Sequence, residues 1–135
     1  MNHKRLRSAL VTGAAKRIGR AIAEDLAANG FSVAIHANGS IGEAEELAAE
    51  LRQKGYRAIA IEADLTDIGE TSALVAKASE ALGHLDLLVN NASIFRQDSA
   101  RSFDAQAWAQ HFDIHVRAPS ILAAAFASCP TMRTD

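Results

Sequence analysis

The sequence predicts an α/β fold, a Rossmann-like, doubly wound parallel sheet. Short apolar runs alternate with segments whose apolar residues recur every three or four positions, as strands alternate with amphipathic helices. Glycines at Gly30, Gly55 and Gly83 stand just after three of these helical segments, where helices commonly end. Two of the runs, SALVTGA and LDLLVNNA, are almost continuously apolar, as inner strands of a parallel sheet are.

Four strands are expected in chain order, at Ser8–Val11, Phe31–His36, Arg57–Glu62 and Leu85–Asn90. The three helices between them are expected where apolar residues share one face: Ile18, Ile22 and Leu26; Ala44, Leu47, Ala48 and Leu51; Ile68, Thr71, Val75, Ala78 and Leu82. The resulting βαβαβαβ order implies parallel pairing through right-handed crossovers, with helices on both faces of the sheet.

A different pattern follows the fourth strand. We expect a loop over Ser93–Arg101 and then one long helix from about Asp104 to Ser128, with Ser102 or Asp104 as its N-cap. Pro119 lies inside this helix and has no backbone N–H, so a kink is predicted there. The chain is therefore expected to form one domain over residues 1–135, truncated after four strands and this helix.

The composition excludes several classes of protein. Hydrophobic residues make up 49% of the chain, enough for a packed core, and the net charge of −2 comes without a sustained basic stripe, which argues against nucleic-acid binding. No apolar segment has membrane-spanning length. The single cysteine, Cys129, rules out an internal disulfide and supplies no cysteine pair for a metal site. We predict a cytoplasmic protein that binds neither metal, membrane nor nucleic acid.

The segment TGAAKRIG, Thr12–Gly19, lies between the first predicted strand and the first helix. In doubly wound sheets, ligands bind at the carboxyl ends of the strands, and free N–H groups at a helix N-terminus attract phosphate. The candidate phosphate-binding residues are therefore Gly13, Arg17, Ile18 and Gly19, with the glycines permitting close approach. The same spacing is compatible with an ordinary tight turn, and that alternative stays open.

The end of the second strand, HANGS, has no acidic residue of the kind that binds the ribose hydroxyls of NAD. A 2′-phosphate would instead receive hydrogen bonds from His36, Asn38 and Ser40, in the loop that also holds Gly39, while Arg17 supplies a fixed positive charge. This set favours NADP over NAD. The alternative for His36 is an ordinary histidine at a strand end.

Three motifs stand at the ends of predicted strands. TGAAKRIG follows the pattern T-G-x-x-x-G-x-G, except that Arg17 replaces the middle glycine. The third strand ends in EADLTD, and the fourth in VNNAS, which follows N-N-A-G except at Ser93. Together they cover nearly the whole chain and resemble the short-chain dehydrogenase/reductase family.

The resemblance implies an oxidoreductase that transfers hydride between NADP and a small-molecule substrate. It also implies that Asp64 and Leu65 contact the adenine of the cofactor. The loop after the fourth strand is implied to border the same site through Asn91, Ala92 and Ser93.

TGAAKR and NNAS resemble the pteridine-reductase branch of that family in particular. This likeness implies that Arg17 reaches the NADP phosphate, that Ser93 lies near cofactor and pterin, and that Phe95 stacks on the pterin ring. Alternatively, Phe95 anchors its loop on the core. Fatty-acyl and sugar ketoreductases share most of the other motifs, so the substrate class depends on very few residues.

The catalytic segment of the family is not found in this sequence. The family uses a tyrosine and a lysine in Y-x-x-x-K, a serine on the fifth strand and an asparagine in the preceding helix. The only tyrosine, Tyr56, starts the third strand and has no lysine four residues later, so no catalytic residue is expected. His115 stands four residues before Pro119, at the position of the helical asparagine. It either relays a proton or faces packed neighbours or solvent.

Two function classes follow. The first is the NADP-binding half of a short-chain reductase that does not catalyse alone; the second is a non-catalytic dinucleotide-binding or protein-interaction module. The fourth strand would lack its next neighbour, and an apolar edge strand invites pairing with another chain. The long helix carries Trp108, Phe112 and Phe126 on the surface that the family uses for dimers. We therefore expect a homo-oligomer, formed through this helix or through the open strand edge.

Overall fold

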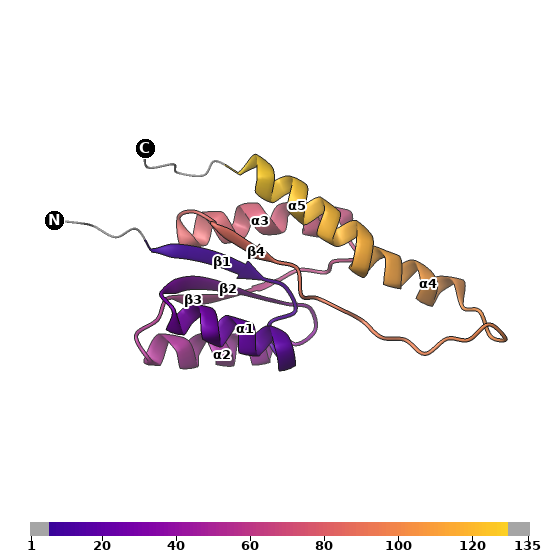
Figure 1. Cartoon of the computed structure of the whole chain (residues 1–135), viewed down its shortest axis with the longest axis horizontal. Helices are drawn as coiled ribbons and strands as arrows, with labels where there is room; N and C mark the ends of the chain where they lie inside the picture. Colours follow the sequence, from indigo (N-terminus) through magenta and orange to yellow (C-terminus); the bar gives the residue numbers. More distant parts are fainter. Residues whose placement is uncertain (1–5, 130–135) are drawn as a thin grey trace.

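The computed structural model describes residues 6–129, and within them a single parallel sheet forms the centre of the fold. Its strands lie in the order β3-β2-β1-β4, all parallel (Figure 1). This confirms the predicted doubly wound, Rossmann-like sheet, and the strands match the expected runs closely at their carboxyl ends. The strands are β1 (Arg7–Val11), β2 (Phe31–Ala37), β3 (Ala58–Glu62) and β4 (Leu87–Val89).

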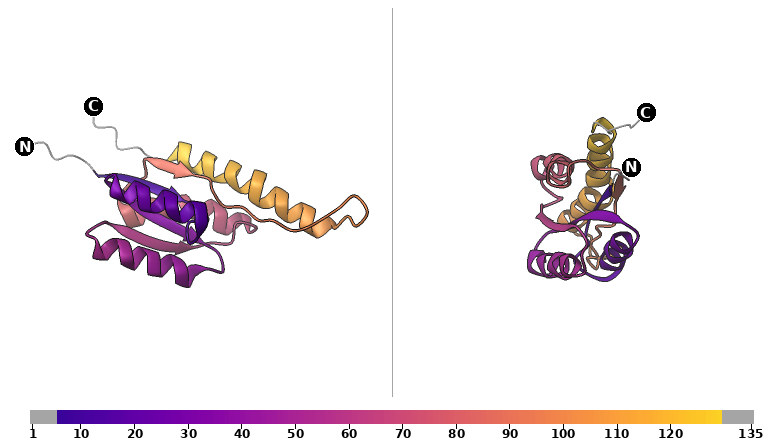
Figure 2. Two further views of the ribbon diagram at one scale, coloured as in Figure 1. Left: turned by 60° about the horizontal axis from the view of Figure 1, so that its bottom comes forward. Right: turned by 90° about the vertical axis from the view of Figure 1, so that its left-hand side faces the viewer.

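Helices cover both faces of the sheet, as the crossovers require. On one face, α1 (Arg17–Ala28) and α2 (Ile41–Gln53) pack on Val11, Val33 and Ile35. On the other, α3 (Ile68–Leu82) and α5 (Ala118–Ser128) pack on Leu10 and Ala34 (Figure 2). Successive residues of one strand point to opposite faces, so neighbouring apolar residues of β1 serve two separate cores.

The long C-terminal helix has three parts: α4 (Ala105–Phe112), a π-helical turn (Asp113–Arg117) and α5. Asp104 caps its start, accepting hydrogen bonds from the backbone N–H groups of Gln106 and Ala107 at 2.9 and 3.1 Å, as predicted. The predicted kink at Pro119 is wrong, because α4 and α5 run on in nearly the same direction (Figure 1). The π turn changes the hydrogen-bond pattern just before Pro119, where the proline N–H would have been needed.

An arm extends past the carboxyl ends of the strands. It consists of the loop of residues 93–104 and the helix α4, and it projects beyond the body of the domain (Figures 1 and 2). Trp108 and Phe112 are 52% and 48% exposed on this arm, whereas Phe126 of α5 is half-buried against the core. Among residues 6–129, no helix is long and apolar enough to cross a membrane.

β4 ends the described sheet. It pairs with β1 on one side only, and its three residues are half-buried. The expected open edge is thus present within the described part of the chain. The predicted domain spans residues 1–135, of which residues 1–5 and 130–135 lie outside the described part of the chain.

Candidate nucleotide-binding site

A cavity of about 430 Å³ opens at the carboxyl ends of β1, β2 and β4, beside the start of α1. It lies where the strand order reverses, because β1 has β2 on one side and β4 on the other. Such reversal points are where ligands bind in open α/β sheets. Most of the predicted cofactor residues line it: Gly13, Arg17, Ile18, Gly19, His36, Asn38, Ser40, Leu65, Asn91, Ala92 and Ser93.

Three predicted residues do not line this cavity. Gly39 lies in the exposed turn after β2, and Asp64 lies one residue before the buried Leu65. Phe95 lies on the arm and is 88% exposed. The alternative in which Phe95 anchors its loop on the core is therefore wrong in this structure.

The two glycines of the phosphate turn have no room for a side chain. A Cβ atom at Gly13 would lie 2.8 Å from the Cα of Ala92. A Cβ atom at Gly19 would overlap the carbonyl oxygen of Gly13 and lie 2.5 Å from the side-chain amide nitrogen of Asn91. Gly19 therefore brings the first turn of α1 against the strand ends, a closer approach than any other residue allows.

Hydrogen bonds join this turn to the loop after β4. The buried hydroxyl of Thr12 accepts from the backbone N–H groups of Asn91 and Ala92, at 3.0 and 2.9 Å. The side-chain amide of Asn91 donates to the carbonyl oxygens of Thr12 and Gly13, both at 3.1 Å. The T-G and N-N-A motifs, far apart in the sequence, thus form one rigid unit at the floor of the cavity.

Arg17 occupies the position of the missing middle glycine, and its backbone shows why glycine is usual there. Its φ is +53°, the only positive φ of a non-glycine residue in the described chain. This left-handed conformation costs an L-residue with a Cβ about 1 kcal/mol relative to glycine. Arg17 therefore keeps the glycine conformation of the turn and adds an exposed guanidinium at the cavity edge.

The helix N-termini at the cavity differ from those elsewhere. Neither α1 nor α2 has a side-chain hydrogen bond at its N-cap, although the α2 N-cap is Ser40, a good capping residue. By contrast, Asp67 caps α3 and Asp104 caps α4. The hydroxyl of Ser40 and the first backbone N–H groups of α1 are therefore left for an outside acceptor.

His36 is a correction to the sequence prediction. It lines the cavity but is only 2% exposed, and both ring nitrogens are engaged: Nδ1 with the backbone N–H of Gly13 at 3.0 Å, Nε2 with the carbonyl of Ala63 at 2.8 Å. Burial lowers the pKa of His36 below its ordinary value of 6.5, and the Ala63 hydrogen bond only partly opposes this. A neutral ring with both nitrogens occupied offers no donor to a phosphate.

Asp64 is directed into its own loop. Its Oδ1 accepts from the hydroxyl of Thr66 at 2.7 Å and from the Thr66 backbone N–H at 2.9 Å. These two bonds, the hydroxyl first, lower the pKa of the Asp64 carboxyl. Asp64 thereby fixes the loop that places Leu65, 4% exposed, in the cavity wall.

Two histidines hold the segment that leaves the cavity. Nε2 of His115 lies 3.1 Å from the hydroxyl of Ser93 and accepts the backbone N–H of Ile94 at 3.3 Å. Nε2 of His111, one helical turn earlier, accepts the backbone N–H of Arg96 at 3.1 Å. His115 thus contacts a residue of the cavity wall, and among the described residues its ring has these polar partners on one nitrogen only.

Sequence comparison decides the family. The family model for the short chain dehydrogenase matches residues 7–134 of this chain. This chain belongs to the short-chain dehydrogenase family. The motifs at the ends of β1, β3 and β4 that predicted this family are the segments that surround the cavity.

Relatives of this short-chain dehydrogenase extend well beyond the matched region. The chain is 39% identical over 114 residues to the 3-oxoacyl-[acyl-carrier-protein] reductase FabG of Staphylococcus aureus, covering 84% of this chain and 46% of the relative. It is similar, with 43% identity and a TM-score of 0.88, to FolM alternative dihydrofolate reductase 1 of Brucella canis, solved with NADP. A short-chain dehydrogenase of Burkholderia cenocepacia, also solved with NADP, gives 39% identity and a TM-score of 0.89.

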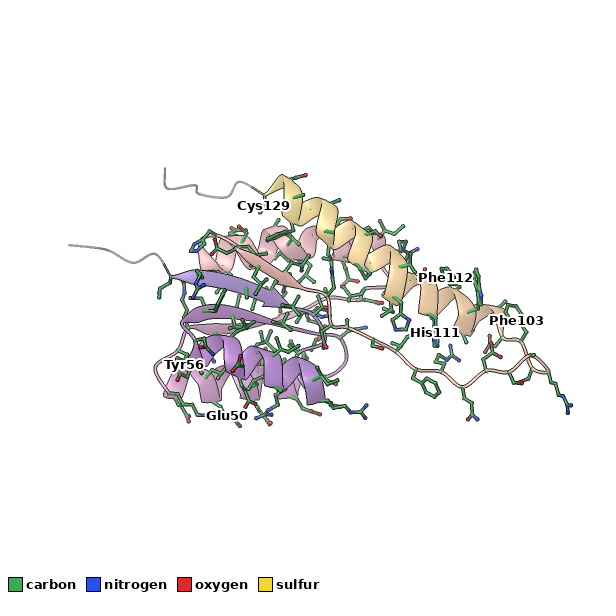
Figure 3. The ribbon with its side chains drawn as sticks, viewed as in Figure 1. Glu50, Tyr56, Phe103, His111, Phe112 and Cys129 are labelled. Carbon is green, nitrogen blue, oxygen red and sulfur yellow. The ribbon has the colours of Figure 1, made fainter. Side chains whose placement is uncertain are left out.

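The two structural matches cover 93% and 95% of this chain, but 50% and 52% of the solved chains. The chain therefore spans about half the length of these relatives. In this short-chain dehydrogenase the only tyrosine, Tyr56, lies before β3, at the end of the sheet opposite the cavity (Figure 3). Among residues 6–129, no cluster of three or more histidine, cysteine or acidic residues forms a metal site.

Sequence reasoning missed several residues of the cavity wall. Lys16 lines it and forms an ion pair with Glu43 of α2, 3.4 Å apart. Ile94 and Ile114 line the side nearest the arm. Lys16 was recognisable as part of the turn, but Ile114 reaches the cavity only because the π turn lies beside the strand ends, and no short-range pattern indicates that.

Proposed function

We propose that this chain is the NADP-binding part of a short-chain oxidoreductase, in which bound NADP supplies or accepts the hydride of a carbonyl or imine substrate. The observation that carries the proposal is the pair of uncapped helix N-termini, those of α1 and α2, beside one cavity. Helix N-termini attract anions, and NADP has both a pyrophosphate and a 2′-phosphate. The NADP complexes of similar proteins agree with this assignment.

The turn after β1 fits the pyrophosphate. The backbone N–H groups of Arg17, Ile18 and Gly19 are in the first turn of α1 and have no intrahelical acceptor. The absence of Cβ atoms at Gly13 and Gly19 lets this turn pack against Asn91 and Ala92 at the edge of the cavity. The positive end of the α1 dipole adds to the attraction for the two phosphate charges.

The start of α2 fits the 2′-phosphate. Asn38 is exposed, the hydroxyl of Ser40 is not used as a cap, and the guanidinium of Arg17 borders the same cavity. Gly39, with a φ of +78°, turns the backbone of this loop without lining the cavity. His36, at the end of β2, holds the neighbouring Gly13 and Ala63 through its ring nitrogens. No carboxylate stands in the segment HANGS to bind the ribose hydroxyls of NAD, so this end of the cavity selects for NADP.

The remaining predicted contacts divide between the two ends of the cofactor. Leu65 gives the adenine an apolar wall, with Asp64 fixing its loop. Asn91, Ala92 and Ser93 form the wall toward the nicotinamide end, where Asn91 also holds the phosphate turn in place.

The substrate class that we propose is a pteridine or a related flat heterocycle. Ser93 borders the cavity, and the ring of Phe95 two residues later is free to stack on a planar ligand. The likeness to FolM alternative dihydrofolate reductase 1 supports this class, whereas the likeness to the 3-oxoacyl-[acyl-carrier-protein] reductase FabG supports a 3-oxoacyl substrate instead. Without a Y-x-x-x-K segment, we expect no turnover of dihydrobiopterin or dihydrofolate by the 135-residue chain alone.

A titration tests the cofactor assignment. Calorimetry should give much tighter binding of NADP than of NAD, and Arg17→Ala should weaken NADP binding about 10- to 100-fold, the value of a charge-assisted hydrogen bond to phosphate. NAD binding should change much less. Arg20→Ala is the matched control, because Arg20 is on the same helix but pairs with Glu24 and Glu50 at 2.8 and 2.9 Å. Equal affinity for NAD and NADP would contradict the assignment.

A second candidate function is association with another copy of this chain. Its support is the arm, where Phe103 is 65% exposed and the rings of Trp108 and Phe112 stack with centroids 4.3 Å apart. Light scattering should show a concentration-dependent increase in mass that Trp108→Glu abolishes. Ile68→Glu is the control, because Ile68 is similarly exposed, at 55%, at the start of α3. A monomer at all concentrations would reject this candidate.

A further inference from the structure

His36 connects the carboxyl ends of three strands. It is the next-to-last residue of β2. Its ring contacts Gly13, two residues after β1, and Ala63, directly after β3. Its own carbonyl oxygen accepts the backbone N–H of Ala14 at 2.9 Å. His36 therefore holds the phosphate turn at two adjacent residues, Gly13 through its ring and Ala14 through its carbonyl oxygen. The same ring holds Ala63, where the loop that carries Leu65 begins.

The hydrogen bonds allow only one state of the ring. Because Nδ1 accepts the N–H of Gly13, it carries no proton, and Nε2 must carry the proton that it donates to the carbonyl of Ala63. A second proton, on Nδ1, would place an N–H donor of the ring opposite the N–H donor of Gly13, with no acceptor between them. Protonation must therefore break the contact with Gly13 and move either the ring or the turn.

Charged side chains lie on the segments packed against His36, but among the described residues no carboxylate is hydrogen-bonded to its ring. Lys16 and Arg17 of the phosphate turn line the same cavity, whereas Asp64 of the loop after β3 and Glu43 of α2 do not. The Asp64 oxygen Oδ1 accepts from Thr66, and Glu43 pairs with Lys16. Burial of the ring, and not a neighbouring charge, is what opposes a positive charge on His36.

We propose that His36 is a positioning residue of the cavity, which holds the phosphate turn in its dinucleotide-binding conformation only while its ring is neutral. Acid then weakens dinucleotide binding without any direct contact between the imidazole and the phosphates. This inference rests on the proposed function for its ligand, but the link between the ring and the turn exists without ligand.

The first test needs no ligand. NMR of the uniformly labelled chain should show His36 as the Nε2–H tautomer at neutral pH, and the Gly13 amide shift should move at the same pH at which the ring titrates. A ring in the other tautomer, or a Gly13 amide that stays unchanged while the ring titrates, would overturn the proposal. This measurement uses the unmodified chain and does not depend on any variant being folded.

The second test compares NADP affinity of the unmodified chain and of His36→Gln between about pH 7.5 and about pH 5. A glutamine amide can accept from Gly13 and donate to Ala63, yet it does not titrate in this range. The 2′-phosphate of NADP titrates identically in both experiments, so only the difference reports His36. The unmodified chain should lose more affinity than the variant as the pH falls, by up to about 10-fold for each pH unit below the pKa of the ring.

The outcomes separate the two proposals. Parallel loss of affinity in both proteins would overturn the role of His36 while leaving the NADP site intact. No NADP binding at any pH, together with coupled titration of His36 and Gly13, would reject the proposed cofactor and uphold the positioning of the turn. His36→Leu, which leaves the Gly13 N–H without an acceptor, should weaken binding at every pH.

Discussion

The turn after β1 and the segment after β4 both border the cavity, but they are held in place by different means. On the turn side, Thr12 and His36 are buried, and the Thr12 hydroxyl, both His36 ring nitrogens and the Asn91 side-chain amide have partners within the chain. The segment from Ser93 onward is mostly exposed and is attached to α4 and the π turn chiefly through the rings of His111 and His115. The phosphate side of the cavity is thus prebuilt, whereas the side toward Phe95 depends on a few contacts at the surface.

The largest expected effect comes from Gly19→Ala, which would break the phosphate turn. The new methyl group would overlap the carbonyl oxygen of Gly13, so α1 must move away from the strand ends. We expect the free energy of unfolding to fall by about 4 kcal/mol or more, measured by urea denaturation. Gly42→Ala is the control: a Cβ atom there would have nothing within 4 Å, and this helical change should be neutral or stabilising by up to about 1 kcal/mol.

Thr12→Val removes the acceptor that joins the two motifs. The valine has almost the same shape, but the backbone N–H of Ala92 loses its partner, and that of Asn91 keeps only the carbonyl of Val89 at 3.1 Å. The expected loss of stability is about 1–3 kcal/mol, the cost of leaving one donor unsatisfied. Thr12→Ser keeps the hydroxyl and should lose much less. A larger loss in Thr12→Ser than in Thr12→Val would show that the methyl group, and not the hydroxyl, holds the turn.

The stability of the prebuilt side should depend on pH through His36. The unfolded chain takes up this proton near 6.5, whereas the buried ring takes it up at lower pH. Between these values the unfolded state binds more protons, so the free energy of unfolding decreases as the pH falls, by at most about 1.4 kcal/mol per unit. His36→Gln should flatten this part of the stability curve, measured by thermal melts across the range.

The smallest effects should come from the exposed side. His115→Ala should speed hydrogen exchange at the Ile94 amide, and His111→Ala at the Arg96 amide, because each variant removes one acceptor. Each serves as the control for the other. Global stability should change by no more than about 1 kcal/mol in either case, since both contacts are exposed. Exchange that rises equally at both amides would mean that the arm moves as one unit.

The sequence was sufficient to locate the strands along the chain and most of the cavity wall. Apolar periodicity located the four strands, and the family pattern located the turn at Gly13 and Gly19. The roles of His36 and Phe95 could not be predicted. Whether a strand-end histidine faces the ligand or its own backbone depends on the register of β1 and β2, and whether a loop aromatic is buried depends on the direction of the arm.

The π turn before Pro119 could not be predicted from the local sequence either. A proline inside a helical pattern predicts that a hydrogen bond is lost, and the local sequence gives no further information about how the helix responds. Packing of Ile114, Ala118 and Leu122 on the sheet keeps the helix in line, so the loss is absorbed by a wider turn. Arg117 at its end also donates to the carbonyl of Thr66 at 2.6 Å, a contact between residues far apart in the sequence.

The open edge at β4 has a directional consequence. Within the described residues, the backbone of β4 pairs with β1 on one side and with no strand on the other. Because the neighbouring ladder is parallel, a strand that continues the pattern must run the same way as β4. A tight hairpin cannot deliver such a strand, so it must arrive through a crossover or from another molecule. The open edge of β4 therefore restricts how the chain can be connected to a strand that continues the parallel pattern, whichever residues that strand contains.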